Sequence, residues 1–269
     1  MRFIAPDRAE FSRDVLRQPP LAQWRDASGW LDAMQFPTVD ELNRDWSGAW
    51  RFVAQTPALL ADGLHYESRI HQHGQIATRA DNWHDFFNAL VWRRYPLLKA
   101  ALNRRQVAEI ALMGDKQRSR AQCALTHFDE GGVIVVLRDA QLLTCWDAHD
   151  WTGLFWEARD AWAQGLIRAE VFGHALLEMA LVPDKLITGK ALVVVEADDR
   201  ARDAAIPALA AAIADGRLLN DPQELRALPV SGIPGWHRAN DEASFYAAAE
   251  CFRPLRTGRR YPPPLRLGD

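Results

Sequence analysis

The run from Thr78 to Trp92 constrains the fold of this chain most, because it places His, Asp and Asn side chains among Phe and Trp, directly after an Arg. We predict an amphipathic helix here, with Asp81 as its N-cap and an end near Arg94. A polar group that is buried without a partner destabilises a fold. Polar side chains in such an apolar run therefore indicate either a functional site or an internal hydrogen-bond network.

The first candidate site lies on this predicted helix. His84 and Asn88 are four residues apart and share one face, with Asp85 beside them. In an enzyme these three would be catalytic, with the imidazole as acid, base or metal ligand. Arg79 and Trp83 would then contact an anionic substrate. Alternatively, Asp85 only stabilises the helix N-terminus, and His84 only bonds a nearby backbone carbonyl.

The second candidate site repeats this spacing. His174 and Glu178 are four residues apart on a predicted helix over residues 171–181, and Gly173 lets another backbone approach closely. An imidazole nitrogen and a carboxylate oxygen at this spacing can bind one metal ion. We predict His174 as a catalytic residue and Glu178 as a metal ligand. Alternatively, Glu178 only fixes the tautomer of His174 within a buried pair.

Two acidic residues, Asp129 and Glu130, form the third candidate. We predict a β-hairpin with strands over residues 123–128 and 133–137, joined at Gly131–Gly132. If this hairpin lies beside the two histidines, its carboxylates complete a cluster that binds a divalent cation. Ordinary turn chemistry explains the same residues without a metal.

Helical patterns dominate the rest of the chain. Pro96 begins a long predicted helix. Another is capped by Asp198 or Asp199 and ends at Gly216. Besides the hairpin, the clearest strand is the apolar run over residues 191–195. We therefore predict an α+β fold that is predominantly helical, with a small antiparallel sheet.

We expect one domain over residues 1–269. A helical segment at 1–45 contains a capping box at Thr38–Glu41. Residues 66–78 are predicted to form two extended pieces around a His-rich turn. The proline- and arginine-rich tail at 253–269 is expected to be irregular and mobile.

Composition and charge narrow the range of partners. The chain has 48% hydrophobic and 25% charged residues and a net charge of -3, which argues against binding nucleic acid or an anionic membrane. No stretch approaches the ~20 apolar residues that cross a bilayer. Charged residues throughout the first twenty positions argue against a signal peptide. We expect the protein to lie in the cytoplasm and to bind a small anionic ligand or a protein.

Cysteines and short motifs exclude several common classes. Cys123, Cys145 and Cys251 are far apart and form no CxxC pair, so we expect reduced thiols rather than a disulfide scaffold. The sequence contains no P-loop, GxGxxG, GxSxG or HExxH motif. A cofactor therefore stays unknown, with a divalent metal ion as the candidate.

Several blocks of the chain together resemble one uncharacterised bacterial family, known as domain of unknown function 3025. The blocks are Thr78–Trp92 with Pro96 and Lys99–Asn103, Leu125–Thr126 with Phe128–Glu130, Gly173–Glu178, and Gly232–Trp236 with Phe245–Tyr246 and Phe252–Pro254. The resemblance covers most of the chain from about residue 45 onward. It implies a soluble bacterial protein but no activity, because the family has none assigned.

Two hypotheses about function follow. In the first, the candidate residues meet in an open pocket where a metal ion activates water, as in a hydrolase acting on a small anionic substrate. In the second, the same residues form a closed hydrogen-bond network, and the Trp-rich surface binds a partner. The sequence leaves the function unknown. We expect a non-catalytic binding or structural role, with the metal-assisted hydrolase as the alternative.

Overall fold

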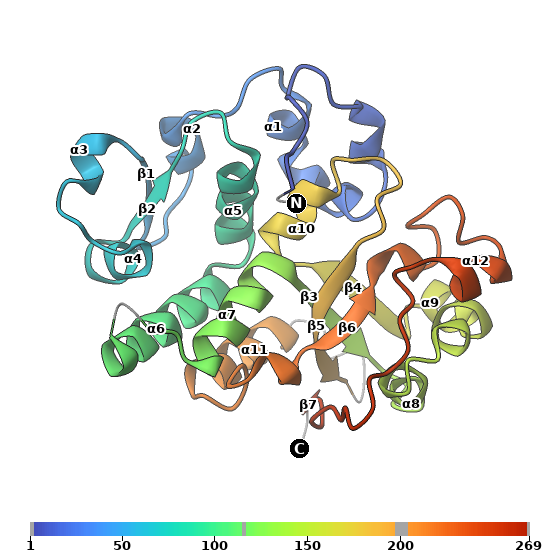
Figure 1. The fold of residues 1–269 in the computed structure, drawn as a ribbon. Helices are drawn as coiled ribbons and strands as arrows, with labels where there is room; N and C mark the ends of the chain where they lie inside the picture. Colours follow the sequence, from blue (N-terminus) through green and yellow to red (C-terminus); the bar gives the residue numbers. More distant parts are fainter. Residues whose placement is uncertain (1–2, 115–116, 197–203, 268–269) are drawn as a thin grey trace.

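A computed structural model describes residues 3–114, 117–196 and 204–267 (Figure 1). Helices form most of its regular structure and accompany two β-sheets. The prediction of a predominantly helical α+β fold is therefore confirmed. Among the described residues, no helix is both long and apolar enough to cross a membrane.

The larger sheet is mixed. In the described part of the chain it has five strands, in the order β4-β3-β5-β6 with β7 against β5. β3 and β7 run parallel to β5, whereas β4 and β6 are antiparallel to their neighbours. The predicted purely antiparallel sheet is corrected, because the chain returns from β3 to β5 through a long crossover. The strands are β3 (Gly132–Leu137), β4 (Ile167–Val171), β5 (Thr188–Val195), β6 (Arg226–Pro229) and β7 (Leu265–Arg266).

The predicted hairpin over residues 123–137 is wrong in its first half. That half belongs to helix α7 (Arg120–Gly131), and β3 begins at Gly132. Ser119 caps α7, because its hydroxyl accepts from the backbone N–H of Gln122 at 3.0 Å in a capping box. Asp129 and Glu130 consequently lie in the last turn of a helix.

The smaller sheet consists of two parallel strands, β1 (Arg51–Ala54) and β2 (Gln75–Thr78). The helices α3 (Pro57–Leu60) and α4 (Tyr66–His73) connect them. The predicted strand near residue 76 is confirmed, but the predicted extended piece at 66–70 is helical. Gly74 ends α4 in the left-handed conformation, with a φ of 64°.

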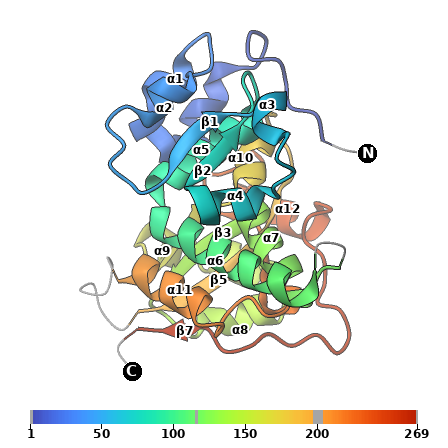
Figure 2. The same ribbon diagram turned by 90° about the vertical axis from the view of Figure 1, so that its left-hand side faces the viewer.

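Five helices pack together in the region between and beside the two sheets (Figures 1 and 2). α4 packs on α6, α6 packs on α7, and α10 contacts both α5 and α7. The long helices begin close to their predicted positions, although Asn82 rather than Asp81 caps α5. The helices here, besides α4 and α7, are α5 (Trp83–Arg94), α6 (Pro96–Met113) and α10 (His174–Met179).

Short helices and irregular segments surround this centre. The predicted capping box of Thr38 and Glu41 is confirmed at α2. The predicted helix over 171–181 is shorter, because its first residue ends β4. The proposed caps Asp198 and Asp199 lie outside the described residues. The remaining helices are η1 (Arg13–Arg17), η2 (Leu21–Ala27), α1 (Ser28–Asp32), α2 (Val39–Asn43), α8 (Leu142–Asp147), η3 (Thr152–Glu157), α9 (Arg159–Ala163), α11 (Ala205–Ala214), η5 (Pro222–Glu224), η6 (Val230–Gly232) and α12 (Ala243–Ala248).

Candidate functional site

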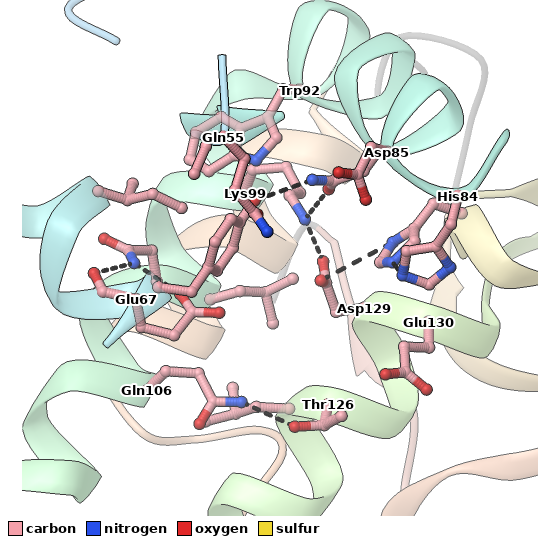
Figure 3. Close-up of a pocket in the computed structure, with 18 of the residues that line it drawn as sticks. Gln55, Glu67, His84, Asp85, Trp92, Lys99, Gln106, Thr126, Asp129 and Glu130 are labelled. Carbon is pink, nitrogen blue, oxygen red and sulfur yellow. Dashed lines mark hydrogen bonds and ion pairs between the residues drawn. The ribbon is translucent and has the colours of Figure 1, made fainter. Parts of the chain in front are cut away.

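A cavity of about 260 Å³ lies where these five central helices meet the ends of β1 and β2 (Figure 3). Glu67 lies on one side of it, and His84 and Glu130 lie on the other. Seven of the nine predicted site residues line this cavity. They are Arg79, His84, Asp85, Asn88, Asp129, Glu130 and His174.

The two predicted histidines are in contact although 90 positions separate them in the chain. Nε2 of His174 lies 3.0 Å from Nε2 of His84, and the two rings meet edge to face. Nδ1 of His84 lies 3.2 Å from Oε2 of Glu178. Glu178 thus contacts His84 on the side away from the cavity and does not line the cavity.

Asp129 joins the imidazole pair to a buried lysine. Its Oδ1 accepts from Nζ of Lys99 at 2.6 Å, and its Oδ2 lies 3.8 Å from Nδ1 of His174. Lys99 also donates to Oδ1 of Asn88 at 2.8 Å, and Asn88 donates to the Tyr66 hydroxyl at 2.9 Å. Helices α7, α6, α5 and α4 therefore contribute to one hydrogen-bonded network, and the imidazole pair lies beside it.

The predicted anion clamp is already paired. Arg79 donates to both carboxylate oxygens of Asp85, with Nη2 to Oδ1 at 2.7 Å and Nε to Oδ2 at 3.0 Å. A bidentate pair of this kind uses the face of the guanidinium that would bind a substrate carboxylate. Asp85 is likewise engaged, so each of the two side chains already has a charged partner.

Trp83 points away from the cavity. Its side chain is buried in the apolar core, stacks on Phe87, and donates from Nε1 to the carbonyl of Pro6 at 3.0 Å. Trp83 therefore does not line the cavity that seven of the other predicted residues share. The residue instead packs the N-terminal segment against α5.

Two charged residues of the cavity wall, Glu67 and Lys99, are absent from the sites predicted from sequence. Glu67 falls in a segment predicted to be extended, and in the structure it lies on α4 with Oε2 accepting from Nδ2 of Asn103 at 2.6 Å. Lys99 belongs to a block of the family resemblance and has no predicted role, although it is 4% exposed. Its position inside the apolar run Leu98–Leu102 is the available clue, because an unpaired lysine is rarely buried.

The environment of the cavity separates the pKa values of its groups. Burial raises the pKa of Glu67 to about 7 and raises the pKa of the Tyr66 hydroxyl. Burial alone would also raise the pKa of Asp129, but the Lys99 ammonium brings it below its ordinary value. Burial lowers the pKa of His174 to about 3, so this imidazole stays neutral over the physiological range.

A metal site finds no support in this geometry. Within the described ranges, no three His, Cys, Asp or Glu side chains are arranged to hold a metal ion. The predicted ligands are separated: Asp129 bonds the Lys99 ammonium, Glu178 bonds His84, and Glu130 is exposed. A protonated amine already occupies the position where a cation would meet Asp129.

The fold and the site thus define an α+β protein with a polar cavity between two sheets. A model of the family described as "Protein of unknown function (DUF3025)" matches residues 50–256, which include every cavity residue. The chain belongs to this family, which confirms the resemblance found in its sequence. Comparisons with curated proteins and with solved structures each gave no match.

Proposed function

We propose that this protein binds a small molecule with an amino group in the cavity between Glu67 and Glu130. The observation that supports this is the balance of charge on the cavity wall. Both cations, Arg79 and Lys99, are paired with aspartates. Within the described residues, the carboxyl groups of Glu67 and Glu130 form no ion pair.

An uncompensated pair of carboxyl groups attracts a cation and repels an anion. The small anionic ligand expected from the sequence is therefore replaced by a cationic one. Glu67 would exchange its proton on binding, because an adjacent ammonium group favours the ionised carboxylate. The cavity volume of about 260 Å³ is close to that of roughly nine liquid waters, so the ligand is metabolite-sized rather than polymeric.

Acid–base catalysis on the same ligand is the second candidate. The pKa of Glu67 is raised to about 7, whereas the pKa of Asp129 is lowered. Carboxyl groups with pKa values driven apart are typical of an acid and a base in one active site. This candidate needs no metal ion and so replaces the metal-assisted hydrolase.

The cellular setting is part of the proposal. All three cysteines are free thiols, which supports a reducing compartment such as the cytoplasm. The family resemblance supports a bacterial source. The hydrogen-bonded network expected for a structural role is compatible with a binding cavity, because the network forms the cavity wall.

The test compares three four-carbon compounds that differ only in their end groups: 1,4-diaminobutane, 1,4-butanediol and succinate. Thermal unfolding is followed at pH 7.5 and matched ionic strength, with the wild type, Glu67→Gln and a control, Glu157→Gln. Glu157 is exposed and lies outside the cavity lining. We expect the diamine to raise Tm in the wild type and the control, the diol to raise it less, and succinate not to raise it.

Glu67→Gln should lose most of the response to the diamine, because its side chain has no charge. A response to succinate as large as that to the diamine would contradict the proposal. So would no response to the diamine, or an unchanged response in Glu67→Gln.

A further inference from the structure

We propose that His174 and His84 form a proton relay that connects Asp129 in the cavity with Glu178 at a separate surface groove. We call the four side chains Asp129, His174, His84 and Glu178 the row. On the side away from the cavity its members are within hydrogen-bond distance, at 3.0 Å between the two imidazoles and 3.2 Å from His84 to Glu178. Its inner gap, from Oδ2 of Asp129 to Nδ1 of His174, is 3.8 Å, about 1 Å longer than a hydrogen bond.

Hydrogen-bond direction fixes the tautomers of the resting row. The Glu178 carboxylate can only accept, so His84 donates from Nδ1 and keeps a lone pair on Nε2. His174 must then donate its Nε2–H to that lone pair. Nδ1 of His174 is left as a bare acceptor, and it is buried without a hydrogen-bond partner among the described residues.

One proton added to His84 reverses the direction of the hydrogen bond between the two imidazoles. When His84 also carries a hydrogen on Nε2, it donates to Nε2 of His174, and the hydrogen of His174 must lie on Nδ1. That hydrogen then faces the Asp129 carboxylate, which relieves the unsatisfied nitrogen. His174 stays neutral in both states, in keeping with its burial.

Transfer through the row conserves atoms and charge. A proton on Oδ2 of Asp129 passes to Nδ1 of His174, the Nε2 hydrogen of His174 passes to Nε2 of His84, and the Nδ1 hydrogen of His84 passes to Glu178. The net result is that one proton has moved from Asp129 to Glu178, and each imidazole has switched to its other neutral tautomer. Glu178 then exchanges with water, because it lines a surface groove beside Asp7 and Asp81.

The use of this relay rests on the proposed function, since it would remove or supply the proton that a cavity ligand exchanges. The relay itself can be tested without a ligand. The charged side chains that face the row from the packed elements are Arg79, Lys99, Asp129, Glu130 and, beside Glu178, Asp7, Arg8 and Asp81.

The experiment is NMR of the full chain with ¹⁵N-labelled histidine, in which the ring nitrogen shifts report each tautomer. Of the eight histidines, His84 and His174 are assigned with His84→Gln and His174→Gln. If one variant fails to fold, the other and the contact between the two rings complete the assignment. At neutral pH we expect the hydrogen on Nδ1 of His84 and on Nε2 of His174.

On acidification, His174 should move its hydrogen to Nδ1 while it remains neutral, in step with protonation of His84. In Glu178→Gln this change should shift to lower pH by roughly one unit, because the favourable carboxylate is gone. The relay is contradicted if His174 keeps its hydrogen on Nε2 while His84 protonates, or if neutral His84 carries its hydrogen on Nε2. Neither outcome depends on the diamine response, so the two proposals can fail separately.

Discussion

The core of the larger sheet and the wall of the cavity bury side chains of opposite chemistry. Val133, Val135 and Val194 in the sheet are aliphatic and fully buried. Lys99 and Asn103 on α6 are almost as well buried, with 4% and 6% of their surface exposed. Exclusion of water stabilises the sheet, whereas it penalises the polar groups of the cavity unless each finds a partner.

This difference indicates that the sheet core and the cavity wall have different roles. A buried ion pair can often be replaced by apolar side chains with no loss of stability. A fold selected for stability alone would therefore not need the pair of Lys99 and Asp129. The polar wall is better explained by a ligand that it must contact.

The largest effect is expected from Lys99→Met, which removes the buried cation from the polar wall of the cavity. The Asp129 carboxylate would lose its cation, and we expect the free energy of unfolding to fall by roughly 3 kcal/mol. Urea denaturation at pH 7.5 measures this loss. The double variant Lys99→Met/Asp129→Leu should regain most of it, and no recovery would show that Lys99 has another essential contact.

The variant Val135→Ala tests the apolar core of the larger sheet. Removing two methyl groups from a fully buried side chain should lower the free energy of unfolding by about 2 kcal/mol. The wild-type Tm shift with 1,4-diaminobutane should persist, because β3 does not line the cavity. Loss of that shift in a folded variant would mean that the sheet and the cavity are energetically coupled.

A smaller effect is expected at the N-terminus of α5, a helix that contributes four cavity residues. Oδ1 of Asn82 accepts from the backbone N–H of Asp85 at 3.0 Å, so Asn82→Ala removes one cap bond. We expect a loss of about 1 kcal/mol in urea denaturation. Asp81→Asn is the control, because Asp81 is exposed, does not cap the helix and has a φ of 52° that asparagine tolerates. Equal losses in the two variants would contradict the assignment of the cap.

Local patterns predicted much of the fold. The helix after Pro96 and the strand at 191–195 follow from signals within the segments themselves. The hairpin predicted at 123–137 is wrong because the capping box at Ser119 is a stronger signal than the β-prone residues around Phe128. The helix α4 was missed because its N-cap is His65, which is not among the residue types that usually begin a helix, and Glu67 was missed with it.

The candidate site was predictable only in part. His84 and His174 were recognised from their spacing with Asn88 and Glu178 on single helices. Their contact depends on the packing of α5 against α10, which no local pattern encodes. The charge balance of the cavity could not be predicted either, because Arg79 pairs with Asp85 only when the loop before α5 folds back.

The most direct test of the account is the stability of Glu67→Gln as a function of pH. Burial raises the pKa of Glu67 to about 7 in the folded chain, from 4.5 when exposed. The contribution of Glu67 to the free energy of unfolding is therefore fully present below pH 4.5, and it is lost as the pH rises through 7. Glutamine cannot ionise, so the variant escapes that loss.

Urea denaturation of the wild type, Glu67→Gln and the exposed control Glu130→Gln at pH 5 and pH 8 measures the difference. We predict that Glu67→Gln gains stability relative to the wild type between pH 5 and pH 8, by at most about 3 kcal/mol, and is the more stable protein at pH 8. A Glu67→Gln protein that is less stable than the wild type at both pH values would contradict the account, because Glu67 would then be a structural group rather than one kept for a ligand.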